Sequence, residues 1–209
     1  MGIRAILFDY GMVLSGPADS DAHESMIGLT GLKKSHFDQL YWAWRHAYDA
    51  GLFDGVGYWD KFAQSAAIEL DIRTVQELIE QDVRMWSNIN QEVVEWAILF
   101  KEKGLKTGIL SNICLELATS VERNLPWLKD FDHLFWSSRL RMAKPDPNLY
   151  KHVIEKLEVP PTEILFLDDR EENVVAARAQ GMRAIQFTTL EAVQRQIKST
   201  GLSFDFHLN

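Results

Sequence analysis

The chain has 209 residues, of which 46% are hydrophobic and 25% charged, so it can bury a substantial core. Its formal net charge of −8 and the absence of any clustered Lys/Arg run argue against binding to nucleic acid or to an anionic membrane surface. The single cysteine, Cys114, excludes an internal disulfide, and no apolar stretch approaches the length of a membrane span. We therefore expect a globular protein of the cytoplasm.

Short apolar segments that are typical of buried parallel strands recur along the chain. The first covers Ile3–Phe8 and ends abruptly at Asp9. The others are Lys106–Leu110, Glu163–Leu167 and Arg183–Phe187, with a weaker segment at His133–Trp136.

Helical patterns lie between most of these segments. Their periodicity and end signals predict helices at Gln91–Lys103, Pro147–Leu157, Glu171–Gln180 and Leu190–Ser199. Strands that alternate with helices predict the α/β class, here a Rossmann-like, doubly wound parallel sheet that is covered on both faces.

The stretch from about Ser15 to Asn88 breaks this alternation, because it has helical periodicity, many aromatic residues and no convincing strand. We interpret residues 15–88 as an inserted α-helical cap domain, and residues 1–14 and 89–209 as the core domain. Aromatic side chains at helical spacing usually pack against one another, so we expect most of them to form the interior of the cap.

Polar residues directly follow the predicted strands or begin a helix near them. In an open parallel sheet, ligands bind beyond the carboxyl ends of the strands, so these residues are the candidates for a site. They are Asp9, Ser111 with Asn112, Lys144, and the pair Asp168 and Asp169.

Most of these candidates also have a purely structural explanation. Ser111 or Asn112 could cap the helix that follows, and Asp169 resembles the start of a capping box. Lys144 could be a solvated surface lysine. Asp9 is harder to explain in this way, because it closes a strand and has no helix of its own to cap.

Taken together, the candidates suit phosphoryl transfer. Asp9 supplies a carboxylate nucleophile, and the acidic pair adds the hard oxygen ligands that Mg²⁺ prefers. Ser111, Asn112 and the backbone N–H groups beside them can hold phosphoryl oxygens, while Lys144 offsets the negative charge of nucleophile and substrate.

The sequence resembles the haloacid dehalogenase superfamily, whose four motifs occur in order as AILFDYGMVL, GILSN, AKPDP and ILFLDDREEN. The last motif looks like that of the subfamily with a helical cap. The pattern over residues 101–187 is similar to the phosphatase-type N-terminal domain of soluble epoxide hydrolases and to bacterial sugar-phosphate phosphatases. The resemblance implies that Asp9 is the nucleophile, that the Gly11 carbonyl and Asp169 are Mg²⁺ ligands, that Asp168 is a ligand or lies directly behind the ligands, that Ser111 binds phosphate, and that Lys144 balances charge.

Gly11 departs from the pattern of the family's phosphatases, which usually carry at this place an aspartate that protonates the leaving group. A glycine can offer its carbonyl to a metal but cannot move a proton. The leaving group must then depend on its own acidity, or on a proton from water or from the cap. The six histidines show no metal-ligand spacing, so we assign none of them a role: His23, His36, His46, His133, His152 and His207.

We therefore predict a Mg²⁺-dependent phosphatase that acts on a small phosphorylated metabolite through an aspartyl-phosphate. Gly11 taken alone favours a 2-haloacid dehalogenase, which works without metal through an aspartyl ester, but the acidic pair argues against it. A catalytically weak binding protein is a further alternative. A signalling receiver domain fits poorly, because its acidic pair precedes the phosphoacceptor. No pattern indicates the substrate or the oligomeric state.

Overall fold

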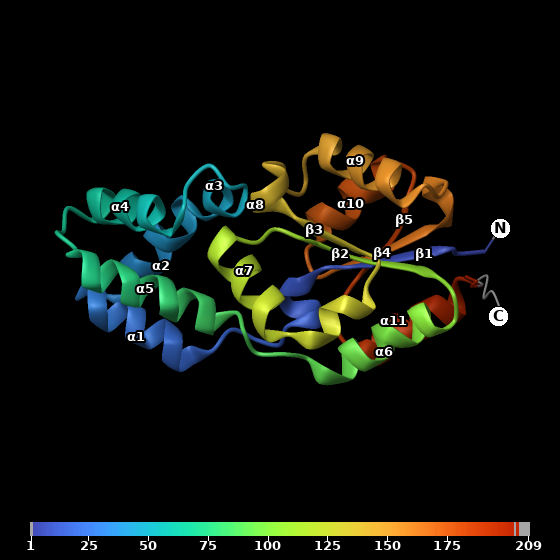
Figure 1. The fold of residues 1–209 in the computed structure, drawn as a ribbon, viewed down its shortest axis with the longest axis horizontal. Coiled ribbons are helices and arrows are strands. Elements are labelled where there is room, and N and C mark those ends of the chain that lie inside the picture. Colours follow the sequence, from blue (N-terminus) through green and yellow to red (C-terminus); the bar gives the residue numbers. More distant parts are fainter. Residues whose placement is uncertain (1, 203, 205–209) are drawn as a thin grey trace.

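The structure of the protein, a computed structural model, describes residues 2–202 and 204. Residues 1, 203 and 205–209, which include His207 and the end of the predicted core domain, lie outside the described part. Five parallel strands form one sheet, as predicted (Figure 1). They are β1 (Ala5–Phe8), β2 (Lys106–Ser111), β3 (His133–Trp136), β4 (Ile164–Asp168) and β5 (Arg183–Gln186). The order of the strands in the sheet, β3-β2-β1-β4-β5, is a finding of the structure.

The central strand β1 fixes the register of its two neighbours. Phe8 pairs with Ile109 of β2 on one side and with Leu167 of β4 on the other. Because all three strands are parallel, their carboxyl ends finish at the same edge of the sheet. The residues that follow these strands are therefore brought side by side.

Helices cover both faces of the sheet, so the doubly wound α/β architecture is confirmed (Figure 1). Ile6 and Phe8 of β1 belong to the apolar cluster that includes residues of α6 (Gln91–Glu102), α7 (Leu115–Asn124) and α11 (Leu190–Ser199). Ala5 and Leu7 belong instead to a second cluster with α9 (Pro147–Leu157) and α10 (Glu171–Ala179). This division follows from the alternation of side chains along a strand.

The segment between β1 and α6 forms a helical lobe that lies beside the sheet at the left of Figure 1. Its helices are α1 (Ser20–Thr30), α2 (Lys34–Ala43), α3 (Arg45–Asp49), α4 (Gly55–Ala66) and α5 (Ile72–Met85). The predicted helical insertion is therefore confirmed. As expected, aromatic side chains fill its interior: Phe37, Tyr41, Tyr58, Trp59 and Phe62 are buried.

The chain enters and leaves this lobe at one place. Ser15 and Ile89 form an isolated antiparallel bridge, and the Gly16 N–H donates to the Asn88 carbonyl at 2.8 Å. This pairing supports our proposal that the cap spans residues 15–88 and the core domain residues 1–14 and 89–209.

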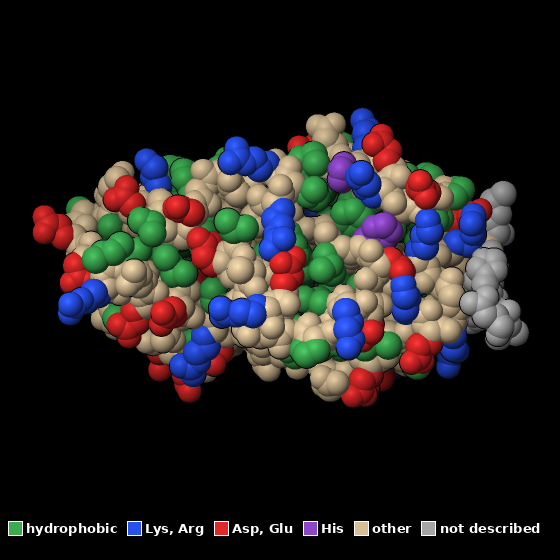
Figure 2. Space-filling view, in the orientation of Figure 1, with side chains coloured by type: hydrophobic (Ala, Val, Ile, Leu, Met, Phe, Trp, Pro, Cys, Tyr) green, Lys and Arg blue, Asp and Glu red, His purple; other side chains and the backbone are tan. Residues whose placement is uncertain are grey.

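The remaining helical segments are short: η1 (Tyr10–Leu14), η2 (Pro126–Asp130), α8 (Ser137–Leu140) and η3 (Pro161–Glu163). In the part of the chain that the structure describes, none of the helices has both the length and the apolar composition needed to cross a membrane. On the face shown in Figure 2, Lys and Arg side chains are intermixed with Asp and Glu rather than gathered in one basic patch.

Candidate active site

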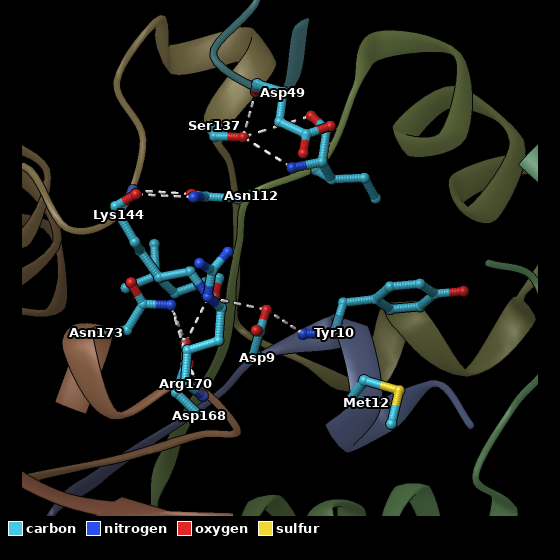
Figure 3. Close-up of polar contacts among 12 residues, drawn as sticks. Asp9, Tyr10, Met12, Asp49, Asn112, Ser137, Lys144, Asp168, Arg170 and Asn173 are labelled. Carbon is cyan, nitrogen blue, oxygen red and sulfur yellow. Dashed lines mark hydrogen bonds and ion pairs between the residues drawn. The ribbon is translucent and has the colours of Figure 1, made fainter. Parts of the chain in front are cut away.

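The carboxyl edge of the sheet brings the predicted site residues together. Figure 3 shows four of them: Asp9, Asn112, Lys144 and Asp168. Asp9 follows β1, Ser111 ends β2, and Asp168 ends β4. All of the predicted residues except Asp168 line one cavity of about 580 Å³, to which the cap also contributes. Asp168 lies behind the cavity wall, where it contacts Lys144.

Lys144 is buried between two carboxylates. Its Nζ lies 2.9 Å from Asp9 Oδ1 and 2.6 Å from Asp168 Oδ2, and it donates to the Leu110 carbonyl at 3.0 Å. The side chain is 1% exposed, so the alternative of a solvated surface lysine is wrong. Burial acts to lower the pKa of Lys144, but the charges of Asp168 and Asp9 outweigh it and leave the pKa raised.

Asp168 is fully enclosed by hydrogen-bond donors. The Asn173 amide donates to both of its carboxylate oxygens, at 2.9 and 3.1 Å, and the Arg170 N–H donates to Oδ1 at 2.9 Å. With Lys144 bound to Oδ2 as well, the carboxylate fixes the position of the lysine. It is placed behind the cavity, one of the two positions that the resemblance allows for it.

Asp9 has one oxygen engaged and one open. Oδ1 accepts from the Tyr10 N–H at 2.7 Å and from Lys144, whereas no described residue donates to Oδ2. Burial raises the pKa of Asp9 to about 7, although the charge of Lys144 acts in the opposite direction. The oxygen without a partner is the one available to a ligand in the cavity.

Three carboxylates converge at this point. Asp9, Asp168 and Asp169 each offer an oxygen, and these oxygens lie within 4.8 Å of one another. Burial raises the pKa of Asp169, and the charge of Asp168 raises it further. Carboxylate oxygens are hard ligands, and several of them crowded together repel one another because all are negatively charged. They fit a divalent cation such as Mg²⁺, which would offset this repulsion.

The helix-capping explanations for the predicted residues are not supported. Helix α7 has Cys114 at its N-cap position and α10 has Arg170, and neither helix has a side-chain cap hydrogen bond. Asn112 is engaged differently: its amide donates to the Lys144 carbonyl and accepts from the Lys144 N–H, both at 2.8 Å. Ser111 lies beside it, facing the cavity, and its hydroxyl has no partner among the described residues.

Gly11 lines the cavity in an ordinary extended conformation, with φ −62° and ψ 129°. A Cβ added at this position would meet nothing within 4 Å. The glycine is therefore not required by backbone strain or by close packing.

The cap closes the other side of the cavity with residues that the sequence did not identify. They are Trp42, Arg45, His46, Asp49 and Trp86. A signal was present, because positions 42, 45, 46 and 49 share one face at helical spacing. It could not be interpreted without knowing which face of the cap covers the sheet edge.

Arg45 is the most tightly held of these cap residues. Its Nε donates to Asp49 Oδ1 at 2.9 Å and its Nη1 donates to Asp82 Oδ1 at 2.7 Å. Because the guanidinium is buried and already pairs with two carboxylates, it adds little free positive charge to the cavity.

Fold and site together define a capped α/β protein whose acidic, lysine-containing site lies at the carboxyl edge of a parallel sheet. A family model described as haloacid dehalogenase-like hydrolase matches residues 3–181. The chain belongs to this family of enzymes, so the resemblance seen in the four sequence motifs is confirmed.

Relatives of known type agree with this assignment. The chain is 28% identical over 213 residues to the phosphatase MT3486 of Mycobacterium tuberculosis, with 98% of each chain covered. It is 32% identical over 138 residues to the bifunctional epoxide hydrolase 2 of Rattus norvegicus, which covers 63% of this chain but only 24% of that protein. Among solved structures, a haloacid dehalogenase family enzyme of Bacteroides thetaiotaomicron in complex with magnesium and inorganic phosphate superposes with a TM-score of 0.74 at 21% identity, covering 90% of this chain and 95% of that one.

Proposed function

We propose that the protein is a Mg²⁺-dependent phosphatase that hydrolyses a phosphomonoester of a small metabolite through an aspartyl-phosphate on Asp9. The observation that carries this proposal is the convergence of three carboxylates and one buried lysine beneath a cavity. An anionic substrate would be repelled by these carboxylates alone. A site with a bound cation and Lys144 can accept it.

Asp9, Lys144 and Ser111 have different roles in the proposed reaction. The open oxygen of Asp9 forms a bond to phosphorus while the bond from phosphorus to the ester oxygen breaks. Lys144 holds the other Asp9 oxygen in place and offsets charge, and the Ser111 hydroxyl is available to a phosphoryl oxygen. Water then attacks the phosphorus of the aspartyl-phosphate, which releases phosphate and restores Asp9.

Asp9, Asp169 and the Gly11 carbonyl would hold Mg²⁺, with Asp168 behind them. The bound cation would supply positive charge that stabilises the phosphoryl oxygens in the transition state. The relatives support this proposal. One of them, matched over 98% of each chain, is a phosphatase, and a protein of the same fold was solved in complex with magnesium and inorganic phosphate.

The cavity sets a bound on the substrate. A volume of about 580 Å³ is within the usual range for sites that enclose one small molecule. The two walls of the cavity differ in character. The core wall carries charged side chains, and the cap wall adds the indoles of Trp42 and Trp86. This arrangement favours a substrate with a phosphoryl group at one end and a compact organic group at the other.

The competing function is a 2-haloacid dehalogenase, which Gly11 favours because halide leaves without a proton. The two are separated by one assay. Purified protein is incubated with a panel of phosphorylated metabolites with and without Mg²⁺, and in parallel with 2-haloacids. Phosphate release that needs Mg²⁺ is expected, whereas halide release in the presence of a chelator would establish the dehalogenase instead.

A further inference from the structure

The proposed phosphatase reaction lacks a proton donor on the core side. The departing ester oxygen of an alkyl phosphate is strongly basic, and general acid catalysis at such an oxygen is typically worth about 10²–10⁴-fold. Gly11 has no side chain to provide it. A donor must therefore come from elsewhere on the cavity wall, or poor leaving groups must react slowly.

Most titratable groups on the core wall are already committed. Asp9, Asp169 and Lys144 belong to the nucleophile and the cation site. Glu172 Oε1 lies 2.6 Å from Arg170 Nη2, and both side chains of this ion pair are exposed. None of these groups is free to deliver a proton to an oxygen that points away from the nucleophile.

The groups beside the cap are similarly constrained, with one exception. The Tyr10 hydroxyl donates to the Trp86 carbonyl at 3.3 Å, and burial raises the pKa of this tyrosine. Asp49 accepts a hydrogen bond from the Nε of Arg45. The proton in that hydrogen bond belongs to a guanidinium, which does not release it. His46 remains.

His46 is exposed on α3 and lines the same cavity as Asp9 and Gly11, from the opposite side. No hydrogen bond or ion pair of its ring is found among the described residues. Asp49, three residues further along α3, lines the same cavity. An imidazole is suited to exchanging protons near neutral pH.

We propose that His46 is the general acid of the phosphatase reaction proposed above. The imidazolium gives one ring proton to the ester oxygen as the bond from phosphorus to oxygen breaks and Asp9 forms its bond to phosphorus. The neutral imidazole then takes a proton from the water that attacks the aspartyl-phosphate, so the cycle closes with no net change. Because the acid lies on the cap and the nucleophile on the core, the acid is on the side of the cavity to which the leaving group departs.

The inference is tested by the dependence of rate on the leaving group. Wild type, His46→Gln and His36→Gln are compared with Mg²⁺ in single turnovers on aryl phosphates of graded leaving-group acidity and on one alkyl phosphate. His36 is the matched control, because it is an exposed cap histidine that does not line the cavity. His46→Asn, a second variant without an acidic proton, guards against an effect of the glutamine itself.

His46→Gln is expected to lose about 10²–10⁴-fold on the alkyl phosphate and little on the most acidic aryl phosphate, which needs no acid. The slope of log rate against leaving-group pKa should steepen in both His46 variants and stay unchanged in His36→Gln. Equal slopes in wild type and the His46 variants would overturn the assignment of His46 alone. A wild-type enzyme that hydrolyses no phosphate ester at all would overturn the proposed function and this inference together.

Discussion

Lys144 is the residue on which the electrostatics of the site depend. It lies between Asp9 and Asp168 in the interior, and it is the cation nearest to both. Breaking a buried ion pair by removing one partner typically costs about 3–5 kcal/mol, because the remaining charge is left unpaired. We expect Lys144→Met to lower the free energy of unfolding by this amount and to abolish turnover.

The loss in Lys144→Met should depend on pH. Burial already raises the folded-state pKa of Asp9, and without the charge of Lys144 this pKa rises further above its unfolded value, so the folded state binds more protons than the unfolded state. Stability is then highest at acidic pH and falls as the pH rises through the raised pKa of Asp9. Denaturant unfolding across this range checks the sign. The double variant Lys144→Met/Asp168→Asn should recover part of the loss, and a double variant less stable than Lys144→Met would contradict this account.

Asp9 should be essential for chemistry but not for folding. Asp9→Asn keeps the shape of the side chain and removes the proposed nucleophile, while Lys144 retains Asp168 as its partner. We expect no detectable phosphate release and a thermal midpoint close to that of the wild type. Activity comparable to the wild type in this variant would be incompatible with the proposed mechanism.

At the scale of elements, the loop after β1 has room for the acid that it lacks. Gly11 has a φ of −62° and open space at its Cβ position, so an aspartate can be accommodated. We expect Gly11→Asp to change the free energy of unfolding by no more than about 1 kcal/mol. In the background of His46→Gln, it should restore part of the rate on alkyl phosphates. A folded, Mg²⁺-binding double variant with no gain would show that this loop does not reach the leaving oxygen.

Helix α7 of the core is hydrogen-bonded to the cap through Glu116. Glu116 accepts from the Tyr48 hydroxyl at 2.9 Å and from the Gly55 N–H at 2.5 Å. We expect Glu116→Ala to lower the free energy of unfolding by about 1–3 kcal/mol and to reduce kcat/KM, because two donors lose their acceptor and the cap wall is held less firmly. Glu155→Ala on the exposed side of α9 is the control. Equal stability of the two variants would remove this role for Glu116.

The sequence predicted the sheet, and it predicted which polar residues of the core meet at the carboxyl edge, because both depend on local signals. Apolar runs identified the strands, and polar residues at their ends identified Asp9, Ser111 and the acidic pair. Helix α7 was not among the helices predicted individually, and its start has no capping side chain, so the usual signal is absent. The burial of Lys144 was also out of reach, since it depends on carboxylates more than twenty residues away in sequence.

At the scale of the whole molecule, cap and core share one hydrophobic interior. The larger apolar cluster includes Phe8 and Ile109 of the sheet together with Tyr58 and Trp59 of the cap. The sequence predicted the inserted lobe but not which of its faces meets the sheet edge, because that depends on packing between segments far apart in the chain. His46 and Trp42 were therefore not identified as cavity residues.

This shared interior predicts cooperative unfolding. In native-state hydrogen exchange with increasing denaturant, buried amides of α4 and of β1 should lose protection in the same global transition. Exchange of the α4 amides through a separate opening, well below the global free energy, would show that the cap folds as an independent unit.

In the proposed mechanism, Asp9 carries the phosphoryl group during turnover. The most direct test is a rapid acid quench of the wild-type protein mixed with Mg²⁺ and a substrate from the panel, followed by mass spectrometry of the peptide that contains Asp9. We predict one phosphoryl group on Asp9 within the first turnover, and none without Mg²⁺ or in Asp9→Asn. Phosphate release at the full rate while Asp9 stays unmodified, or a carbon ester on Asp9 after reaction with a haloacid, would contradict the account.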